Sequence, residues 1–251
     1  MSIQIFPVIG LPLIKKMDDL SKLIVSAIKK QGIEFLDGDV LVLCHVIVSK
    51  AEGRIIDLKT VTPSKSSINF AEYTGKDPRL VEVILNEARA IRRMGPGVLV
   101  TETKQGFVCA NSGVDKSNVP GDDIVAPLPS DPDKSAQEVR KRILELTSKN
   151  IAVIIADTHG RAHRDGEVNV AVGASGFSVI RDRRGEKDLF GYELKIKRTA
   201  IADELAGAAE LVIGQANEGI PAAIIRGYKL PVSETSDAKE LVRPREKDLF
   251  I

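Results

Sequence analysis

The stretch that decides the fold is residues 151–166, IAVIIADTHGRAHRDG. Residues 151–156 are a short and continuous run of apolar residues, most of them β-branched. Such a run is typical of a strand buried on both faces of a sheet. Polar residues begin at Asp157, so we expect them at the carboxyl edge of the strand, where open α/β sheets usually hold their ligands.

The residues after this strand combine two kinds of ligand-binding group. Asp157 and Thr158 offer the hard oxygen ligands that divalent cations prefer. Gly160 is predicted to turn the backbone, and Arg161 and Arg164 follow as guanidinium groups suited to phosphate or carboxylate. A cation site beside an anion site indicates phosphoryl transfer. An Asp after a strand is also a common turn cap, and exposed arginines commonly form surface ion pairs, so both alternatives stay open.

Composition restricts the classes of partner. The 251 residues carry 36 basic and 35 acidic side chains, a formal net charge of +1, so no overall field attracts nucleic acid or an anionic membrane. Cys44 and Cys109 lie in apolar strand-like runs without CxxC spacing, which predicts reduced core cysteines. The first residues lack the pattern of a signal peptide, and no apolar run could span a bilayer. We therefore expect a soluble, unprocessed cytoplasmic protein.

Apolar periodicity and turn residues predict the remaining elements in the first half of the chain. In order, we expect a strand at 3–8, a helix between Asp19 and Gly32, a strand at 40–48, a connector without firm structure at 58–75, a helix from Asp77 to the stop at 95–97, and a hairpin of 98–101 with 107–110.

The second half is predicted in the same way. We expect a helix near 135–146, a strand at 168–180, an edge strand at 192–197, a helix at 202–211 and a buried strand at 221–225. Residues 1–230 form the predicted catalytic domain, and residues 231–251 a charged tail packed on the same domain or on a dimer partner. The pentapeptide EKDLF occurs twice, ending at Phe190 and Phe250, which is coincidence or a shared docking role.

Short motifs occur along the chain in a fixed order: GLP at 10–12, VSKAEGR at 48–54, NSGVD at 111–115 followed by Asn118, DTHGR at 157–161, and GIPA at 219–222. Together they resemble the coenzyme F420-0:L-glutamate ligase family, from about residue 6 to about residue 227. The resemblance implies a mixed α/β fold with mixed sheets and two intimately connected lobes. The chain has no GxxxxGK[ST] loop, and neither a P-loop nor a Rossmann fold is expected.

The resemblance also implies an activity. It is the GTP-dependent addition of L-glutamate to F420-0 through an acyl phosphate, by a homodimer that uses Mg²⁺ or Mn²⁺. The resemblance allows γ-glutamyl extension as a further step and K⁺ as an additional ion. The sequence itself offers a dimer only edge-like strands and the apolar end at 249–251.

Site residues follow from the matching motif positions. The family's metal ligands fall on Asp115, Asp157 and Thr158, and the catalytic set is Asp115, Asp157 and Arg161. Its nucleotide contacts fall on Ile9, Gly10, Leu11, Pro12, His45, Val46, Lys50, Asn118, Gly214, Gln215 and Glu218. For Lys50, a solvated lysine in a loop is an equal alternative to a phosphate contact. We expect Asp115 and Asp157 to share one metal site, so that neutralising either should leave the metal-free fold intact or slightly more stable.

The chain departs from the family pattern at three places. His45 and Val46 stand where small hydroxyl residues are frequent, residues 215–217 replace a glycine-rich acidic run, and His159 stands where Asn or Phe is common. Nucleotide and acceptor choice therefore stay open. Two alternatives are a carboxylate–amine ligase with a different acceptor and a non-catalytic nucleotide- or deazaflavin-binding homologue.

Overall fold

The computed structural model describes residues 2–248, and it confirms a mixed α/β fold with several sheets. The main sheet has the strand order β1-β12-β2-β8-β9. Only β2 and β8 are parallel, and the other neighbours are antiparallel. The strands are β1 (Gln4–Pro7), β2 (Val40–Cys44), β8 (Ala152–Arg161), β9 (Arg164–Ser175) and β12 (Ala222–Arg226).

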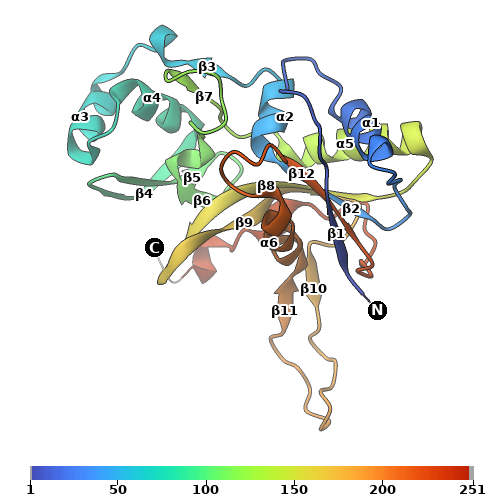
Figure 1. Ribbon diagram of the computed structural model, residues 1–251. Helices are drawn as coiled ribbons and strands as arrows, with labels where there is room; N and C mark the ends of the chain where they lie inside the picture. Colours follow the sequence, from blue (N-terminus) through green and yellow to red (C-terminus); the bar gives the residue numbers. More distant parts are fainter. Residues whose placement is uncertain (1, 249–251) are drawn as a thin grey trace.

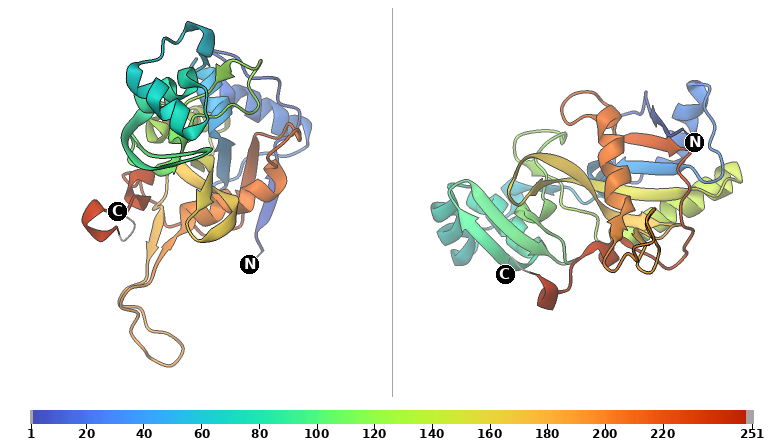
Figure 2. Two further views of the ribbon diagram at one scale, coloured as in Figure 1. Left: turned by 90° about the vertical axis from the view of Figure 1, so that its left-hand side faces the viewer. Right: turned by 90° about the horizontal axis from the view of Figure 1, so that it is seen from below.

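Helices cover both faces of this sheet, which explains the continuous apolar runs of its central strands. Helices α1 (Leu20–Lys30) and α5 (Pro132–Thr147) lie on one face, and α6 (Ile201–Ile213) lies on the other (Figures 1 and 2). The buried face of α6 includes small residues, among them Ala202, Ala206 and Ala209, so the helix packs closely on the sheet.

A second lobe has its own hydrophobic cluster, built around buried residues such as Leu58, Ile84 and Leu99. The two lobes expected from the family resemblance are thus present (Figure 1). The elements of the second lobe are β3 (Ile56–Asp57), η1 (Leu58–Thr60), α3 (Lys65–Thr74), α4 (Pro78–Glu87), β4 (Ala88–Gly95), β5 (Val98–Thr103), β6 (Val108–Ala110), η2 (Asn111–Gly113) and β7 (Ile124–Val125).

Two predictions in this lobe are wrong. The connector expected at 58–75 contains helix α3, which begins after an N-cap hydrogen bond from Ser67 N–H to Ser64 and ends at Gly75 with a φ of 72°. The helix expected to reach residue 95 ends at Glu87, and β4 follows it. Register shifts along the β4–β5 pair interrupt the alternation that would have marked a strand. The hairpin of β5 and β6 is confirmed.

Two boundaries next to the candidate site also differ from the prediction. Strand β2 ends at Cys44, and the rest of the expected strand forms helix α2 (His45–Ala51), because a short apolar run fits either structure. Strand β8 continues through Arg161, so Gly160 lies within the strand and the hairpin turn falls at 162–163, where His163 has a φ of 60°. The turn predicted at Gly160 is therefore wrong.

A narrow arm projects from the main lobe between β10 (Ile180–Asp182) and β11 (Arg198–Ala200) (Figure 1). The strand expected at 192–197 is absent from this arm, where β11 begins only at Arg198. Near the tip, Leu189 is 98% exposed and Phe190 is 96% exposed. This is the first copy of the repeated pentapeptide, whereas the second copy runs into residues 249–251, which lie outside the described residues together with the expected apolar end.

The tail packs on the main lobe. Ala238, in η3 (Ala238–Leu241), is fully buried, and its N–H donates to Asp133 on α5. Glu234 forms an ion pair with Arg140 of the same helix, and a last turn, η4 (Arg245–Lys247), follows. Within residues 2–248, no helix has the length and apolar character needed to cross a membrane.

Candidate functional site

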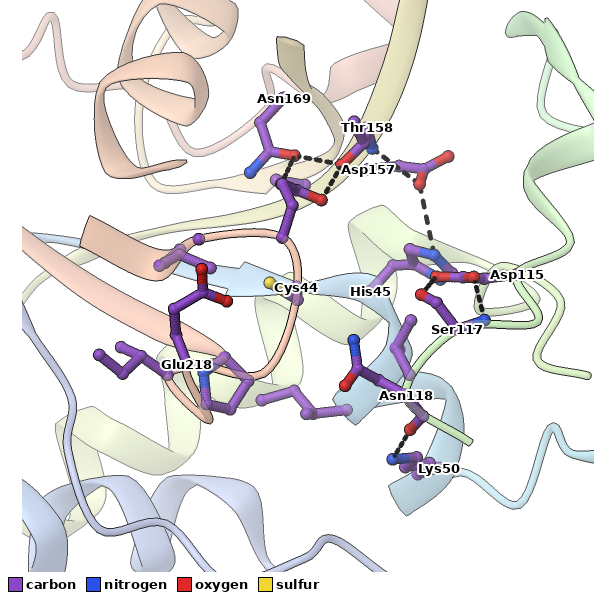
Figure 3. A pocket seen from close by; sticks show the side chains of 18 of the residues that line it. Cys44, His45, Lys50, Asp115, Ser117, Asn118, Asp157, Thr158, Asn169 and Glu218 are labelled. Atoms are coloured by element: carbon purple, nitrogen blue, oxygen red, sulfur yellow. Dashed lines mark hydrogen bonds and ion pairs between the residues drawn. The ribbon is translucent and has the colours of Figure 1, made fainter. Parts of the chain in front are cut away.

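A cavity of about 530 Å³ lies at the edge of the main sheet where β1 and β2 end and β12 begins. The β1–α1 loop, helix α2, the segment after β6, strands β8 and β9, and the α6–β12 loop all contribute side chains to its lining. The chain thus brings segments that are far apart in sequence to one hollow beside the buried sheet (Figure 3).

Asp157 of β8 is held between two imidazoles. Its Oδ1 lies 3.3 Å from Nε2 of His45, and its Oδ2 lies 3.0 Å from Nε2 of His159. The N–H of Thr158 also donates to Oδ1, at 2.8 Å. Burial would raise the pKa of Asp157, but the charge of His45 and the hydrogen bond from His159 outweigh it and hold this pKa below its usual value. The carboxylate is therefore ionised and fixed in place.

His159 also contacts Cys109 of β6. Burial would lower the pKa of His159, but its hydrogen bonds with Asp157 and Cys109 raise that pKa to about 10. Cys44, at the end of β2, is half-buried and lines the cavity. Burial, together with the charges of Asp157, Glu210 and Asp115, raises the pKa of Cys44 to about 12, so this thiol stays protonated.

Three neutral oxygens converge on the other side of β8. Thr158 Oγ1 lies 2.8 Å from Asn169 Oδ1 (Figure 3) and 2.9 Å from Gln215 Oε1. One hydroxyl proton cannot serve both acceptors at once. Gln215 Nε2 also lies 3.4 Å from Asn169 Oδ1, while Asn169 is buried and its Nδ2 has no hydrogen-bond partner among the described residues. Hydroxyl and amide oxygens are ligands of the kind that a divalent cation binds.

Asp115 reaches the cavity from a strained turn after β6. Asn111, Ser112 and Gly113 all have positive φ, and a Cβ at Gly113 would lie 2.7 Å from a carbon of Leu128, so only glycine fits there. The carboxylate of Asp115 accepts hydrogen bonds from the N–H of Ser117 at 2.6 Å and from its hydroxyl at 2.9 Å. This turn places a second carboxylate in the cavity lining.

Lys50 supplies the positive charge. It lies near the end of α2, half-buried, and its ammonium donates to the main-chain oxygen of Asn118. Burial lowers the pKa of Lys50, and Asp115 opposes that shift. A desolvated ammonium with donors to spare suits a phosphate oxygen.

Comparison with known proteins decides the family. Residues 8–227 match the family described as F420-0:Gamma-glutamyl ligase. The chain belongs to this family. It is 51% identical to the coenzyme F420:L-glutamate ligase of Methanothermobacter thermautotrophicus over 251 residues, which is 100% of this chain and 99% of the relative. It is 44% identical to the enzyme of the same name from Archaeoglobus fulgidus over 250 residues, covering 100% of this chain and 97% of that one.

Most site residues carried over from the F420-0:gamma-glutamyl ligase family line the cavity. They are Leu11, Pro12, His45, Val46, Lys50, Asp115, Asn118, Asp157, Thr158, Gly214, Gln215 and Glu218. Ile9 and Gly10 lie just outside it. Arg161 and Arg164 are at the end of the β8–β9 hairpin and are not part of the lining, and Arg161 Nη2 donates to the main-chain oxygen of Asp165 at 3.1 Å. The arginines therefore stand apart from the hollow that holds the carboxylates.

Sequence reasoning missed Asn169 as a cavity residue, and it missed the role of His159 beside Asp157. Asn169 lies directly across the β8–β9 pair from Thr158, so the correct turn position at 162–163 would have placed the two together. His159 follows Asp157 by two residues on β8, and residues at that spacing share one face of a strand.

The residues present fit the divalent cation that the family implies. The donors are two carboxylates and a group of neutral oxygens, the set that Mg²⁺ and Mn²⁺ prefer. Consecutive residues of a strand point to opposite faces, so Asp157 and Thr158 present their oxygens on different sides of β8, Thr158 beside Asn169 and Gln215. Asp115 lines the same cavity.

Proposed function

We propose that the protein is a GTP-dependent ligase that joins L-glutamate to coenzyme F420-0, with Mg²⁺ or Mn²⁺ as cofactor. The observation that supports this most directly is the cavity. Two carboxylates, three neutral oxygens and a half-buried lysine meet there, in a chain that resembles named ligases over its whole length. K⁺ would be a further cofactor.

The reaction activates a carboxylate. The terminal phosphoryl group of GTP moves to the carboxylate of F420-0, GDP leaves, and the α-amine of glutamate then attacks the acyl phosphate to form an amide and release phosphate. Lys50 is placed to hold phosphate oxygens of the nucleotide, and the α6–β12 loop with Gly214 and Glu218 forms the facing wall. Further glutamates would be added through γ-linkages.

A bound cation would neutralise the charge on the phosphate oxygens. Asp115 and Asp157 would hold one ion, and Thr158 with Gln215 and Asn169 would hold another. His45 and His159 keep the carboxylate of Asp157 ionised and oriented at the cavity.

We also propose that the enzyme is a homodimer that contains the projecting arm in its interface. Leu189, Phe190 and Ile196 are almost fully exposed on this arm. Several large apolar side chains on a thin projection favour burial against another protein surface, and a second copy provides one by symmetry.

The test incubates the purified protein with GTP, MgCl₂ or MnCl₂, L-glutamate and F420-0, and it measures the product mass and released phosphate. We expect a product one glutamate heavier, with one phosphate released for each amide formed. Asp115→Asn and Asp157→Asn should each lower the rate by orders of magnitude, because metal stabilisation of the transferring phosphate contributes several kcal/mol.

Two other outcomes would replace this proposal. Phosphate release coupled only to some other acid in an acceptor screen would identify a ligase with a different acceptor. Nucleotide or deazaflavin binding without any phosphate release would identify a non-catalytic homologue. Substituting ATP for GTP in the same assay tests nucleotide choice.

A further inference from the structure

On the side of Asp157 that faces β6 lies a second group of possible metal ligands, in which Asp157 is joined by Cys109, a residue that the proposed ligation does not use. The thiol of Cys109, a carboxylate oxygen of Asp157 and an imidazole nitrogen of His159 all lie within 4.8 Å of one another. Cys109 is buried, and the side chains of Asp157 and His159 are each only 12% exposed. Neither Cys109 nor His159 lines the cavity.

The geometry points to a site for a thiophilic divalent cation such as Zn²⁺, with Cys109, Asp157 and His159 as ligands. Zinc binds Cys, His and carboxylate at about 2.0–2.3 Å in a tetrahedron. Ligand atoms around such an ion are therefore about 3–4 Å apart, and the His159–Asp157 separation is already 3.0 Å. Three protein ligands leave a fourth position for water, and binding would release to solvent the proton that His159 shares with Asp157.

The fold itself assembles the three ligands. Asp157 and His159 are two residues apart on β8, so their side chains point to the same face of the strand. Cys109 comes from β6 in the second lobe, beside that face. A cation there would link the second lobe to the main sheet, so it should stabilise the folded chain as well as bind to it.

His45 occupies the other oxygen of Asp157. Its side chain is only 3% exposed, and its Nε2 forms an ion pair with Oδ1 at 3.3 Å. The oxygen next to His159 is Oδ2, so His45 is not one of the three proposed ligands. Nitrogen and sulfur on this side of Asp157 contrast with the oxygens around Thr158.

Occupation of this site should also regulate the enzyme. A zinc ion on Oδ2 would draw Asp157 toward Cys109 and away from the cavity, where the carboxylate is needed as a magnesium or manganese ligand. This consequence rests on the proposed function, whereas binding of the ion does not.

The test titrates Co²⁺, a spectroscopic substitute for Zn²⁺, into the full chain without substrates, and then displaces it with Zn²⁺. Thiolate coordination gives a sulfur-to-cobalt charge-transfer band in the near ultraviolet. We expect this band in the wild-type protein and in Cys44→Ser, the matched control for the other cysteine, but not in Cys109→Ser. His159→Asn should raise the dissociation constant for Co²⁺ about tenfold to a hundredfold, as expected when a group of the metal site is lost.

Circular dichroism and urea unfolding establish that each variant is folded before the titration. If Cys109→Ser is unfolded, Cys109→Ala and His159→Asn are titrated in its place, and both are expected to show the loss of Co²⁺ binding. A wild-type protein without the band, or a band that survives in Cys109→Ser and disappears in Cys44→Ser, would overturn the proposal. In the ligation assay, Zn²⁺ should inhibit the wild-type protein reversibly and should inhibit Cys109→Ser less strongly. If only this inhibition is absent, the regulatory role is wrong and the metal site remains.

Discussion

Replacing Asp157 by Asn tests the arrangement at the centre of the site. The carboxylate lies 3.3 Å from His45 and 3.0 Å from His159, and both imidazoles are largely buried. Removing one partner of a buried ion pair costs about 3–5 kcal/mol. Asn keeps a hydrogen-bond acceptor and a histidine can lose its proton, so we expect a loss of about 2–4 kcal/mol in the free energy of unfolding near pH 5.5.

The pH dependence of this loss has a definite sign. The pKa of His159 is raised to about 10 from its usual 6.5, so its contribution to stability is complete below about pH 6.5, where the unfolded chain is also protonated. Above that pH the unfolded chain releases the proton while the folded chain keeps it, and the contribution falls by at most about 1.4 kcal/mol per pH unit until about pH 10. The pKa of Asp157 is lowered, so its contribution is complete above the usual pKa of a carboxyl group and is lost progressively as the pH falls from there toward the lowered pKa of the folded chain.

The free energy of unfolding is measured by urea unfolding of wild type, Asp157→Asn and Asp115→Asn. The measurements are made without metal at about pH 5.5 and about pH 8.5. The difference between wild type and Asp157→Asn should be larger at the lower pH. The carboxylate of Asp115 accepts hydrogen bonds only from Ser117 among the bonds described, one on each oxygen. Asn keeps one acceptor, and its amide N–H can donate to the Ser117 hydroxyl instead, so Asp115→Asn should change stability by less than about 1 kcal/mol at both pH values. An Asp157→Asn protein as stable as wild type near pH 5.5, or a difference that grows with pH, would refute the reasoning.

Two further predictions concern other parts of the chain. Lys50→Ala should raise the KM for the nucleotide about tenfold to a hundredfold in steady-state kinetics, because one charge-assisted hydrogen bond to phosphate contributes about 1.5–3 kcal/mol. The control is Lys65→Ala, which removes an exposed lysine at the start of α3 and should leave this KM unchanged. Equal KM values for wild type and Lys50→Ala would exclude the phosphate contact. The double substitution of Leu189 and Phe190 by Ser should convert a dimer into monomers in light scattering with the melting temperature of the main lobe retained, and a dimer that persists would place the interface elsewhere.

The sequence predicted the parts of the site that depend on local patterns. The apolar runs at 40–48 and 151–156 identified the two central strands, although the first strand ends at Cys44, and polar residues that follow the two strands do line the cavity. Capping residues located helices such as α4 at Asp77, where the side chain accepts from Arg79 N–H. These signals are carried within a few residues of the chain, so a reading of one sequence recovers them.

The parts that failed depend on pairing between distant residues. The length of β8 beyond Asp157 is set by its partner β9, and a polar strand that continues past the core has no apolar alternation to mark it. Strand β4 was missed for a similar reason, because the bulges in its pairing with β5 interrupt the two-residue alternation of buried and exposed side chains. The imidazoles on either side of Asp157 likewise meet only in the folded chain, and they reverse the sign expected for the metal-free Asp157→Asn protein. The expectation considered repulsion between Asp115 and Asp157 but not attraction to His45 and His159.

Strand β8 explains why two kinds of ligand can lie so close together. Its buried half is fixed between β2 and β9, with Ile154 paired to Val42 on one side and to Ala174 on the other. The polar half continues from this anchored core, so alternation sends Asp157 and His159 to one face and Thr158 to the other. A slip of one residue would exchange the two faces and would also move the apolar run out of register with the helices that cover it. The burial of residues 151–156 therefore holds the carboxylate among imidazoles and the hydroxyl among amide oxygens, and the core of the sheet, more than any loop, sets the chemistry of the site.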